Sequence, residues 1–120
     1  MGMTHITVAV SDLAKSTSPY EGEVLVDTGA IDCLAPSDRL LAAGIKPEGK
    51  AVSELADGTP VELEYGFARI KFFGEETVAQ VIFAAPGSEP ILGAVALENV
   101  GVVVDPVSET LKRLHARSLK

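Results

Sequence analysis

The sequence predicts a single domain built mainly from β-strands, with one or two short helices. Apolar and other side chains alternate with a period of two over residues 4–10, as in a half-buried strand. Asp57-Gly58 lies between two apolar runs, and this dipeptide is a strong signal for a β-hairpin. Three consecutive valines at 102–104 add a further strand pattern. The 120 residues suit one domain, and no repeat or linker divides residues 1–120.

Turn residues and apolar runs define the remaining elements in chain order. A polar stretch at 15–19 separates the first strand from the second. Pro36 suits the first position of a short helix, and Gly44 suits its left-handed end. A turn at 74–76 leads into another strand, and residues 86–90, rich in proline, form a loop. We expect strands at 4–10, 20–26, 52–55, 61–67, 77–84 and 101–105, helices from Pro36 and at 94–99, and no defined element over the basic, weakly patterned residues 111–120.

The apolar pattern changes phase after the predicted hairpin. Leu63 and Phe67 are apolar at odd positions, whereas Ile70 and Phe72 are apolar at even positions. A single strand cannot keep both sets on one face. We therefore expect a bulge or a sharp bend over residues 66–69.

Composition excludes several classes of partner. The chain has 17 acidic and 10 basic residues and a formal net charge of −7, which argues against a phosphate-binding surface and so against a nucleic acid partner. No apolar run reaches the roughly 18 residues of a membrane span, so we expect no membrane partner. The N-terminal residues lack the basic and leucine-rich pattern of a signal peptide, and we therefore expect a cytoplasmic protein.

Cysteine and histidine are too few for disulfide or metal chemistry. Cys33 is the single cysteine, which rules out an internal disulfide and zinc-finger spacing. We expect Cys33 to be a small packed side chain and not a nucleophile, because His5 and His115 both sit near the termini. These histidines are too isolated for a metal site, so the sequence predicts no metal and no cofactor.

One carboxylate stands in an unexpected place, directly after the apolar run 24–26. An ionised carboxylate is costly at the end of a buried strand unless it is paired or hydrogen-bonded. A simple turn is the alternative, since Asp and Gly are common in turns, and the triplet alone is only suggestive. Further along the chain, two apolar residues run into a glycine ahead of the second predicted helix. The residues of the two motifs are Asp27, Thr28, Gly29 and Ala30 in the first and Ile91, Leu92 and Gly93 in the second.

This pair of motifs, in this order, resembles the retroviral-type (retropepsin-like) aspartic proteases and their single-domain bacterial relatives. The segment LENVGVVVDP, residues 97–106, looks especially like the bacterial branch. The resemblance covers about residues 20–114 and implies a closed β-barrel of the acid-protease type, with one lobe per chain. It also implies an aspartic endopeptidase that acts on a peptide or protein substrate.

In that family the catalytic water lies between two carboxyl groups, and the resemblance assigns one of them to Asp27. One carboxyl deprotonates the water while the other donates a proton to the peptide carbonyl oxygen. Two carboxyls about 3 Å apart cannot both ionise, so they share one proton, as in aspartic proteases generally. The chain has one such motif. The second carboxyl is therefore expected from Asp27 of another copy in a C2 homodimer.

The other motif residues are expected to support the catalytic loop. Gly29 lets the backbone approach the substrate and the carboxylates closely. In the family, the threonine that matches Thr28 reaches across to the loop of the partner. Gly93 belongs to a strand that crosses behind the loop, where the family packs the residues that match Ile91 and Leu92.

The predicted hairpin falls where the family carries its flap, a mobile cover that closes over bound peptide. The alternative is an exposed turn, and the local sequence does not separate the two. The order of the motifs favours the flap. The predicted flap and substrate-binding residues are Ser53, Glu54, Leu55, Ala56, Asp57, Gly58 and Thr59.

Two alternatives compete with this interpretation. Asp32 is the nearest candidate for an internal second carboxyl, although we expect it to be a solvated carboxylate in the strand that leaves the loop. The protein could also be a catalytically silent retropepsin-like interaction or oligomerisation domain. The intact motif at Asp27 favours the peptidase.

Two positions depart from the viral pattern. Many retroviral enzymes have an acid directly after Asp-Thr-Gly-Ala and an arginine directly after the second glycine. Ile31 and Ala94 occupy these positions here, so an ion pair between them is absent. The dimer must therefore be supported in another way.

Overall fold

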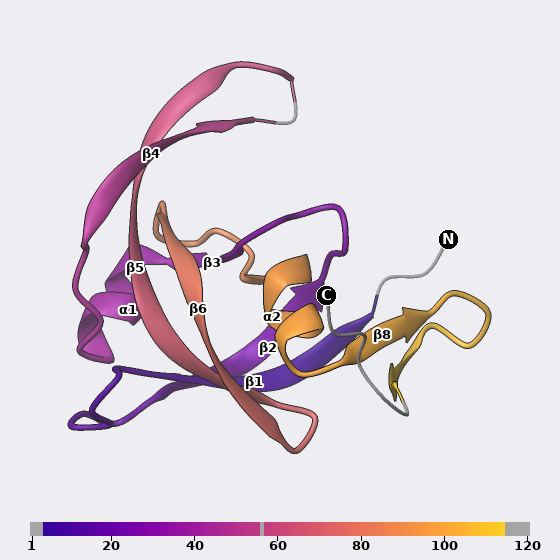
Figure 1. Ribbon diagram of the computed structural model, residues 1–120. Helices are drawn as coiled ribbons and strands as arrows, with labels where there is room; N and C mark the ends of the chain where they lie inside the picture. The colour runs from indigo at the N-terminus through magenta and orange to yellow at the C-terminus, as the bar shows by residue number, and fades with distance from the viewer. Residues whose placement is uncertain (1–3, 56, 115–120) are drawn as a thin grey trace, which may run out of the picture.

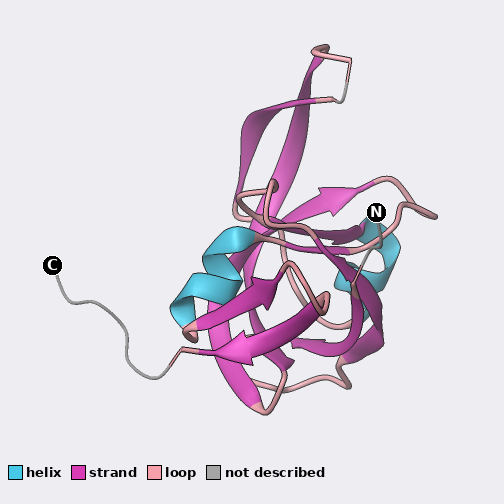
Figure 2. Ribbon diagram, turned by 90° about the vertical axis from the view of Figure 1, so that its right-hand side faces the viewer, coloured by secondary structure: helices cyan, strands magenta, loops and turns pink. Residues whose placement is uncertain are grey.

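The structure, a computed structural model of the chain, describes residues 4–55 and 57–114 and is made mainly of β-strands, as the sequence predicts (Figures 1 and 2). No helix in the described part of the chain is long and apolar enough to cross a lipid bilayer. The described elements are β1 (His5–Ser11), β2 (Tyr20–Val26), β3 (Cys33–Pro36), α1 (Ser37–Ala42), β4 (Gly49–Glu54), β5 (Pro60–Phe72), β6 (Glu75–Ala84), β7 (Ile91–Leu92), α2 (Ala94–Asn99), β8 (Val102–Asp105) and β9 (Thr110–Arg113).

Seven strands form one sheet in the order β1-β2-β7-β3-β6-β5-β4, and β8 and β9 form a separate two-stranded sheet. The pairs β2–β7 and β3–β6 are parallel, and the other pairs are antiparallel. β1 also pairs with β5, from Ala9↔Lys71 to Ser11↔Arg69. The sheet therefore curls back onto its first strand (Figure 1). The closed barrel that the resemblance implies stays a prediction.

The hydrophobic core fills the inside of this curled sheet. Ile70 of β5, Val81 of β6 and Leu92 of β7 are almost fully buried, and Val102 extends the core to β8. No polar or charged side chain is buried among the residues that the structure describes. Burying an aliphatic side chain of this size stabilises the fold by about 1.5–3 kcal/mol. The strand that carries the second motif is thus anchored in the core.

The first helix, α1, begins one residue after Pro36, not at Pro36 as predicted. Pro36 still pairs with β6 as the last residue of β3, and its φ of −59° suits both a strand and a helix start. The helix ends as predicted, because Gly44 has a φ of +84°. Gly44 N–H donates to Leu41 O and Ile45 N–H donates to Leu40 O, each at 3.0 Å. These two bonds form a Schellman motif.

Of the bulge or sharp bend that the sequence predicts over residues 66–69, the bulge is wrong. β5 pairs with β6 without interruption from Tyr65↔Ile82 to Phe72↔Glu75, so no residue is inserted. The phase change has another cause, because the first half of β5 forms a projecting hairpin with β4 and the second half lines the core (Figure 1). The more buried positions of β5 are odd up to Tyr65 and even after it.

Gly66 stands where this change occurs. A Cβ at Gly66 would lie 2.6 Å from Lys46 O and 3.2 Å from the ring of Phe83. A backbone oxygen cannot move aside cheaply. Glycine is therefore required where β5 passes the segment between α1 and β4.

The other boundaries agree with the sequence prediction to different degrees. β2 and α2 have the predicted bounds, β1 and β8 differ by one residue, and β4 and β5 are longer. The β5–β6 turn consists of Phe73 and Gly74 instead of residues 74–76, and both have positive φ, as in a type I′ turn. A positive φ is uncommon for phenylalanine, so residue type did not indicate this turn. β9 was not predicted, and it is defined by its pairing with β8.

Candidate active site

Strand pairing brings the two sequence motifs together. β7 pairs in parallel with the end of β2, through Leu25↔Ile91 and Val26↔Leu92. On its other side β7 pairs with β3. Residues 27–32, which we call the β2–β3 loop, therefore connect the two neighbours of β7. The Asp-Thr-Gly motif lies beside the Ile-Leu-Gly motif as a result.

Hydrogen bonds hold Asp27 at the start of this loop. Its N–H donates to Leu92 O at 3.0 Å, and its carbonyl accepts from Ala30 N–H at 3.1 Å. The carboxylate oxygen Oδ1 accepts from Gly29 N–H at 2.9 Å. No described residue donates to Oδ2, and Asp27 is only half-buried. The loop thus orients one carboxylate oxygen and leaves the other open to a water or a proton.

Both motif glycines stand in crowded positions, and a side chain would collide with backbone at Gly93. A Cβ at Gly93 would lie 2.6 Å from Asp32 C and 2.8 Å from Ile31 O, which are both backbone atoms. A Cβ at Gly29 would lie 3.2 Å from Asp27 Oδ1. The end of β7 and the loop therefore approach as closely as glycine alone permits at Gly93, whereas a side chain at Gly29 would press only on the end of the Asp27 side chain.

The first residues of α2 bind carbonyl groups of the β2–β3 loop. Ala94 N–H donates to Ala30 O at 2.8 Å, and Val95 N–H donates to Ile31 O at 3.1 Å. The first N–H groups of a helix have no partner within it, so the loop satisfies them. Backbone bonds thus join loop and helix without the ion pair of viral enzymes. The sequence did not single out Val95, because a backbone donor leaves no signal in residue type.

Asp32 is not the solvated carboxylate that the sequence predicts. It is half-buried, and Gln80 Nε2 donates to its Oδ2 at 3.1 Å. Burial raises the pKa of Asp32, and the hydrogen bond from Gln80 acts in the opposite direction. Sequence reasoning missed Gln80, because it lies on β6, far along the chain. This carboxylate has a structural partner of its own.

Thr28 is exposed at the tip of the first motif. No described residue forms a hydrogen bond with its hydroxyl. The partner that the sequence predicts for it belongs to another copy of the chain. The role of Thr28 therefore stays a prediction.

The predicted flap residues lie at the end of the β4–β5 hairpin, which projects from the body above the β2–β3 loop (Figures 1 and 2). Leu55 N–H donates to Thr59 O at 2.9 Å, and Asp57 Oδ1 accepts from Thr59 N–H at 2.9 Å. Gly58 has a φ of +87°, which favours glycine. Of the predicted residues, Ser53 and Glu54 end β4, Leu55, Asp57, Gly58 and Thr59 form the turn region, and Ala56 lies outside the described residues.

The two faces of this hairpin differ in character. Side chains alternate between the faces along both strands, as the regular pairing of β4 with β5 requires. One face carries small or medium-sized, mostly apolar side chains, and the other face carries mainly acidic side chains. The half-buried face carries Ala51, Ser53, Val61 and Leu63, and the exposed face carries Lys50, Val52, Glu54, Glu62 and Glu64.

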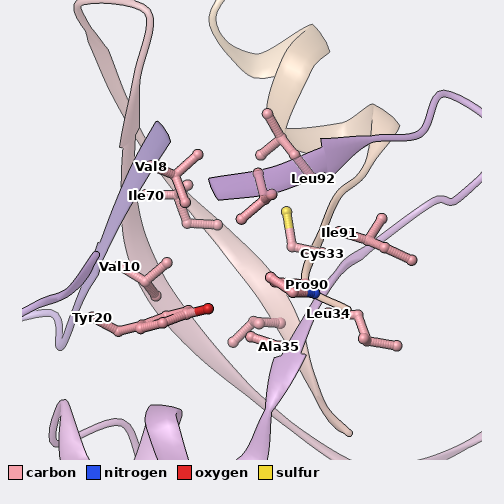
Figure 3. A pocket seen from close by; sticks show the side chains of 12 residues that line it. Val8, Val10, Tyr20, Cys33, Leu34, Ala35, Ile70, Pro90, Ile91 and Leu92 are labelled. Carbon is pink, nitrogen blue, oxygen red and sulfur yellow. The ribbon is translucent and has the colours of Figure 1, made fainter. Parts of the chain in front are cut away.

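Cys33 lines a small apolar cavity inside the sheet (Figure 3). The cavity has a volume of about 20 Å³, and Val8, Ile70 and Leu92 also line it. This is room for about one water and not for a substrate. Burial raises the pKa of Cys33 to about 11, so the thiol is neutral and unreactive at pH 7. The described residues contain no group of three or more His, Cys, Asp or Glu side chains that could hold a metal ion.

This arrangement of strands is the retropepsin-like protease fold, which confirms the fold type that the two motifs implied. The EIAV protease, solved in complex with the inhibitor HBY-793, is similar to the chain with a TM-score of 0.61. The similarity covers 83% of this chain and 89% of that chain, at 21% sequence identity. At this identity it shows the fold alone. No family model and no curated protein sequence matches the chain.

Proposed function

We propose that the protein is an aspartic endopeptidase that acts as a homodimer, with one catalytic carboxyl from Asp27 of each copy. The observation that carries the proposal is Asp27 itself. Bonds to Leu92 and Gly29 hold it at the end of a core strand, with one carboxylate oxygen open. The retropepsin-like fold supports the same assignment. A purely structural domain has no need of a carboxylate in this position.

The proposed reaction uses two carboxyls that share one proton. The ionised carboxyl accepts a proton from a water, whose oxygen forms a bond to the carbonyl carbon of the peptide. The protonated carboxyl donates its proton to the carbonyl oxygen, which gives a tetrahedral diol. Proton transfer to the nitrogen then breaks the C–N bond. A diol hydroxyl gives a proton to the carboxyl that protonated the carbonyl oxygen. The products, a carboxylic acid and an amine, then leave, and the two carboxyls again share one proton.

Other parts of the site support this chemistry in the proposal. The end of the β4–β5 hairpin, residues 53–59, acts as a flap that closes over a peptide and excludes water. Its place above the β2–β3 loop supports that role (Figure 1). Thr28 of each copy bonds across the two-fold axis, and Gly29, Ala30 and residues 91–93 hold the loop. The cytoplasmic location and the bacterial branch stay predictions from the sequence.

The test compares the wild type with Asp27→Asn on a diverse peptide library, at acidic and at neutral pH, with products identified by mass spectrometry. We expect the wild type to cleave internal peptide bonds. Asp27→Asn keeps the shape of the side chain but removes the acid, so activity should fall on the order of 10³-fold or more.

Asp32→Asn is the matched control, because it makes the same change five residues along the chain. Its partner is Gln80, whose amide can bond an asparagine as well. We expect this variant to keep its activity within about threefold of the wild type. Cleavage that survives Asp27→Asn, or no cleavage by the wild type under any condition, would contradict the proposal. The second result would favour the silent interaction domain.

A further inference from the structure

A surface hollow adjoins the candidate catalytic loop. It has a volume of about 250 Å³, and its walls come from the β2–β3 loop, α2 and β8. The apolar side of α2 and the valines of β8 make the hollow mostly hydrophobic, with one carboxylate in its lining. The hollow, which we call the Thr28 hollow, is lined by Thr28, Ala94, Leu97, Glu98 and residues 102–104.

The β8–β9 hairpin presents apolar side chains to solvent beside this hollow. Val107 lies in its turn and is 92% exposed. Val103 is 39% exposed and Leu114 is 49% exposed. The two strands pair only with each other, so each has an unpaired edge within the described chain. Such a two-stranded sheet is marginal by itself and gains stability from a partner surface.

The turn that carries Val107 is held in one shape. Asp105 Oδ1 accepts from Val107 N–H at 2.9 Å, and Glu109 N–H donates to Asp105 O at 2.8 Å. Thr4 Oγ1 donates to Glu109 O at 2.7 Å and ties the turn to the N-terminal side of β1. An apolar side chain on a fixed turn loses little freedom on binding, which favours a contact through it.

The other end of the hairpin is fixed to the main sheet by Arg113. Its Nη2 donates to Phe73 O at 2.5 Å, and its Nε donates to Glu75 Oε2 at 3.0 Å. The guanidinium carbon also lies 4.5 Å from the centre of the Phe73 ring. The hairpin is therefore a rigid projection of the molecule. Figure 1 shows it on the same side as the β2–β3 loop, with α1 on the opposite side, and Figure 2 views that side.

We propose that this side is the docking surface for a second copy of the chain, with Val107 of each copy seated in the Thr28 hollow of the other. The inference rests on the proposed function, because a site with one Asp27 per chain is incomplete without a second copy. The hollow is continuous with the loop that must meet its counterpart, and it has room for a valine side chain. A two-fold axis makes the contact twice, so each copy supplies both the protruding side chain and the hollow.

The charge of Glu98 gives the contact a recognisable signature. A carboxylate placed at residue 107 of one copy would approach Glu98 of the other and be repelled, whereas an ammonium would be attracted. Val107→Glu should therefore raise the dimer dissociation constant by at least about tenfold. Val107→Lys should raise it less, and the difference should shrink at high salt because salt screens the charges.

Sedimentation velocity over a dilution series of the full chain measures these constants. Leu41→Glu is the matched control, because Leu41 is also an exposed aliphatic residue, at 54%, but lies on α1. We expect it to change the dissociation constant by less than about twofold. An unchanged constant for Val107→Glu, an equal loss for Leu41→Glu, or a wild type that is monomeric at every concentration would overturn the inference.

A disulfide experiment tests the seating itself. Val107→Cys protein is mixed with Val103→Cys protein under mild oxidation, and the products are separated without reductant. Val103 lines the hollow, so we expect linked heterodimers to dominate. The buried Cys33 thiol should not compete. Linked homodimers of Val107→Cys alone would place the two turns against each other and overturn the proposed contact.

Peptidase assays on the same variants separate this inference from the proposed function. Cleavage that requires Asp27 but is unchanged by Val107→Glu would support the proposed function and contradict the proposed docking surface. If Val107→Glu dissociates the dimer but the wild type has no peptidase activity, the docking surface would be supported and the proposed function contradicted.

Discussion

Gly93 shows at the scale of one residue how the candidate site is built. The carbonyl and backbone carbon of Asp32 lie so close that a methyl group at Gly93 has no space. These are main-chain atoms of the loop that starts at Asp27, so a side chain at Gly93 would push the loop away from β7. The same glycine donates its N–H to Cys33 Sγ at 3.5 Å.

Gly93→Ala should therefore destabilise the fold by about 1–3 kcal/mol, as overpacked sites do. Chemical denaturation measures this change. Gly22→Ala is the control, because a Cβ there would meet only the end of the Tyr20 side chain, at 3.3 Å from its hydroxyl. We expect that variant to stay within about 1 kcal/mol of the wild type. Equal stabilities for Gly93→Ala and the wild type would show that the loop and β7 do not meet as described.

Residue type predicted part of this site and not the rest. Asp27, Gly29 and Gly93 could be proposed from the sequence because each belongs to a motif of unusual composition. Gln80 and Val95 could not. Gln80 acts through a contact between distant strands, and Val95 acts through its backbone N–H, which every residue except proline carries.

At the scale of elements, strands could be predicted from alternating side chains, as in β1, or from a run of β-branched residues, as in β8. β5 shows the limit of this rule, because its two halves belong to a projecting hairpin and to the core. The apolar residues change from odd to even positions where the hairpin half meets the core half, and a bulge would produce the same sequence pattern. β9 shows the opposite case, since its residues carry no alternation and its strand arises from pairing with β8 and from Arg113.

Arg113→Ala should release the β8–β9 hairpin from the main sheet. The variant loses the bond to the Phe73 carbonyl, the ion pair with Glu75 and the contact with the ring. We expect amide hydrogens of β8 and β9 to exchange about tenfold faster, with little change in β1 and β2. Lys112→Ala is the control, because the ion pair of its side chain with Asp105 is long, at 4.0 Å. Unchanged exchange in Arg113→Ala would show that the hairpin is held in another way.

At the scale of the whole molecule, the chain order of the strands differs from their order in the sheet. β7 lies between β2 and β3 in the sheet, although the 54 residues 37–90 separate the end of β3 from the start of β7 in the chain. Alternation of side chains carries no information on such pairings. The retropepsin-like arrangement could be expected only from the resemblance of the two motifs, and the structural similarity to the EIAV protease confirms that fold type.

The central claim also concerns the whole molecule: the active site needs an Asp27 from each of two chains. Wild type and Asp27→Asn can be mixed in varied ratios and allowed to exchange subunits, at a fixed total concentration well above the dimer dissociation constant. The random pairing of two chains then sets how many dimers have both carboxyls.

Peptidase activity of these mixtures against the wild-type fraction is the most direct measurement. Activity should follow the square of that fraction, so an equal mixture should retain about a quarter of the wild-type activity. The same mixtures made with Asp32→Asn should keep nearly full activity. A linear decline with Asp27→Asn, with about half of the activity left in an equal mixture, would show that each chain carries a complete site and would contradict the account.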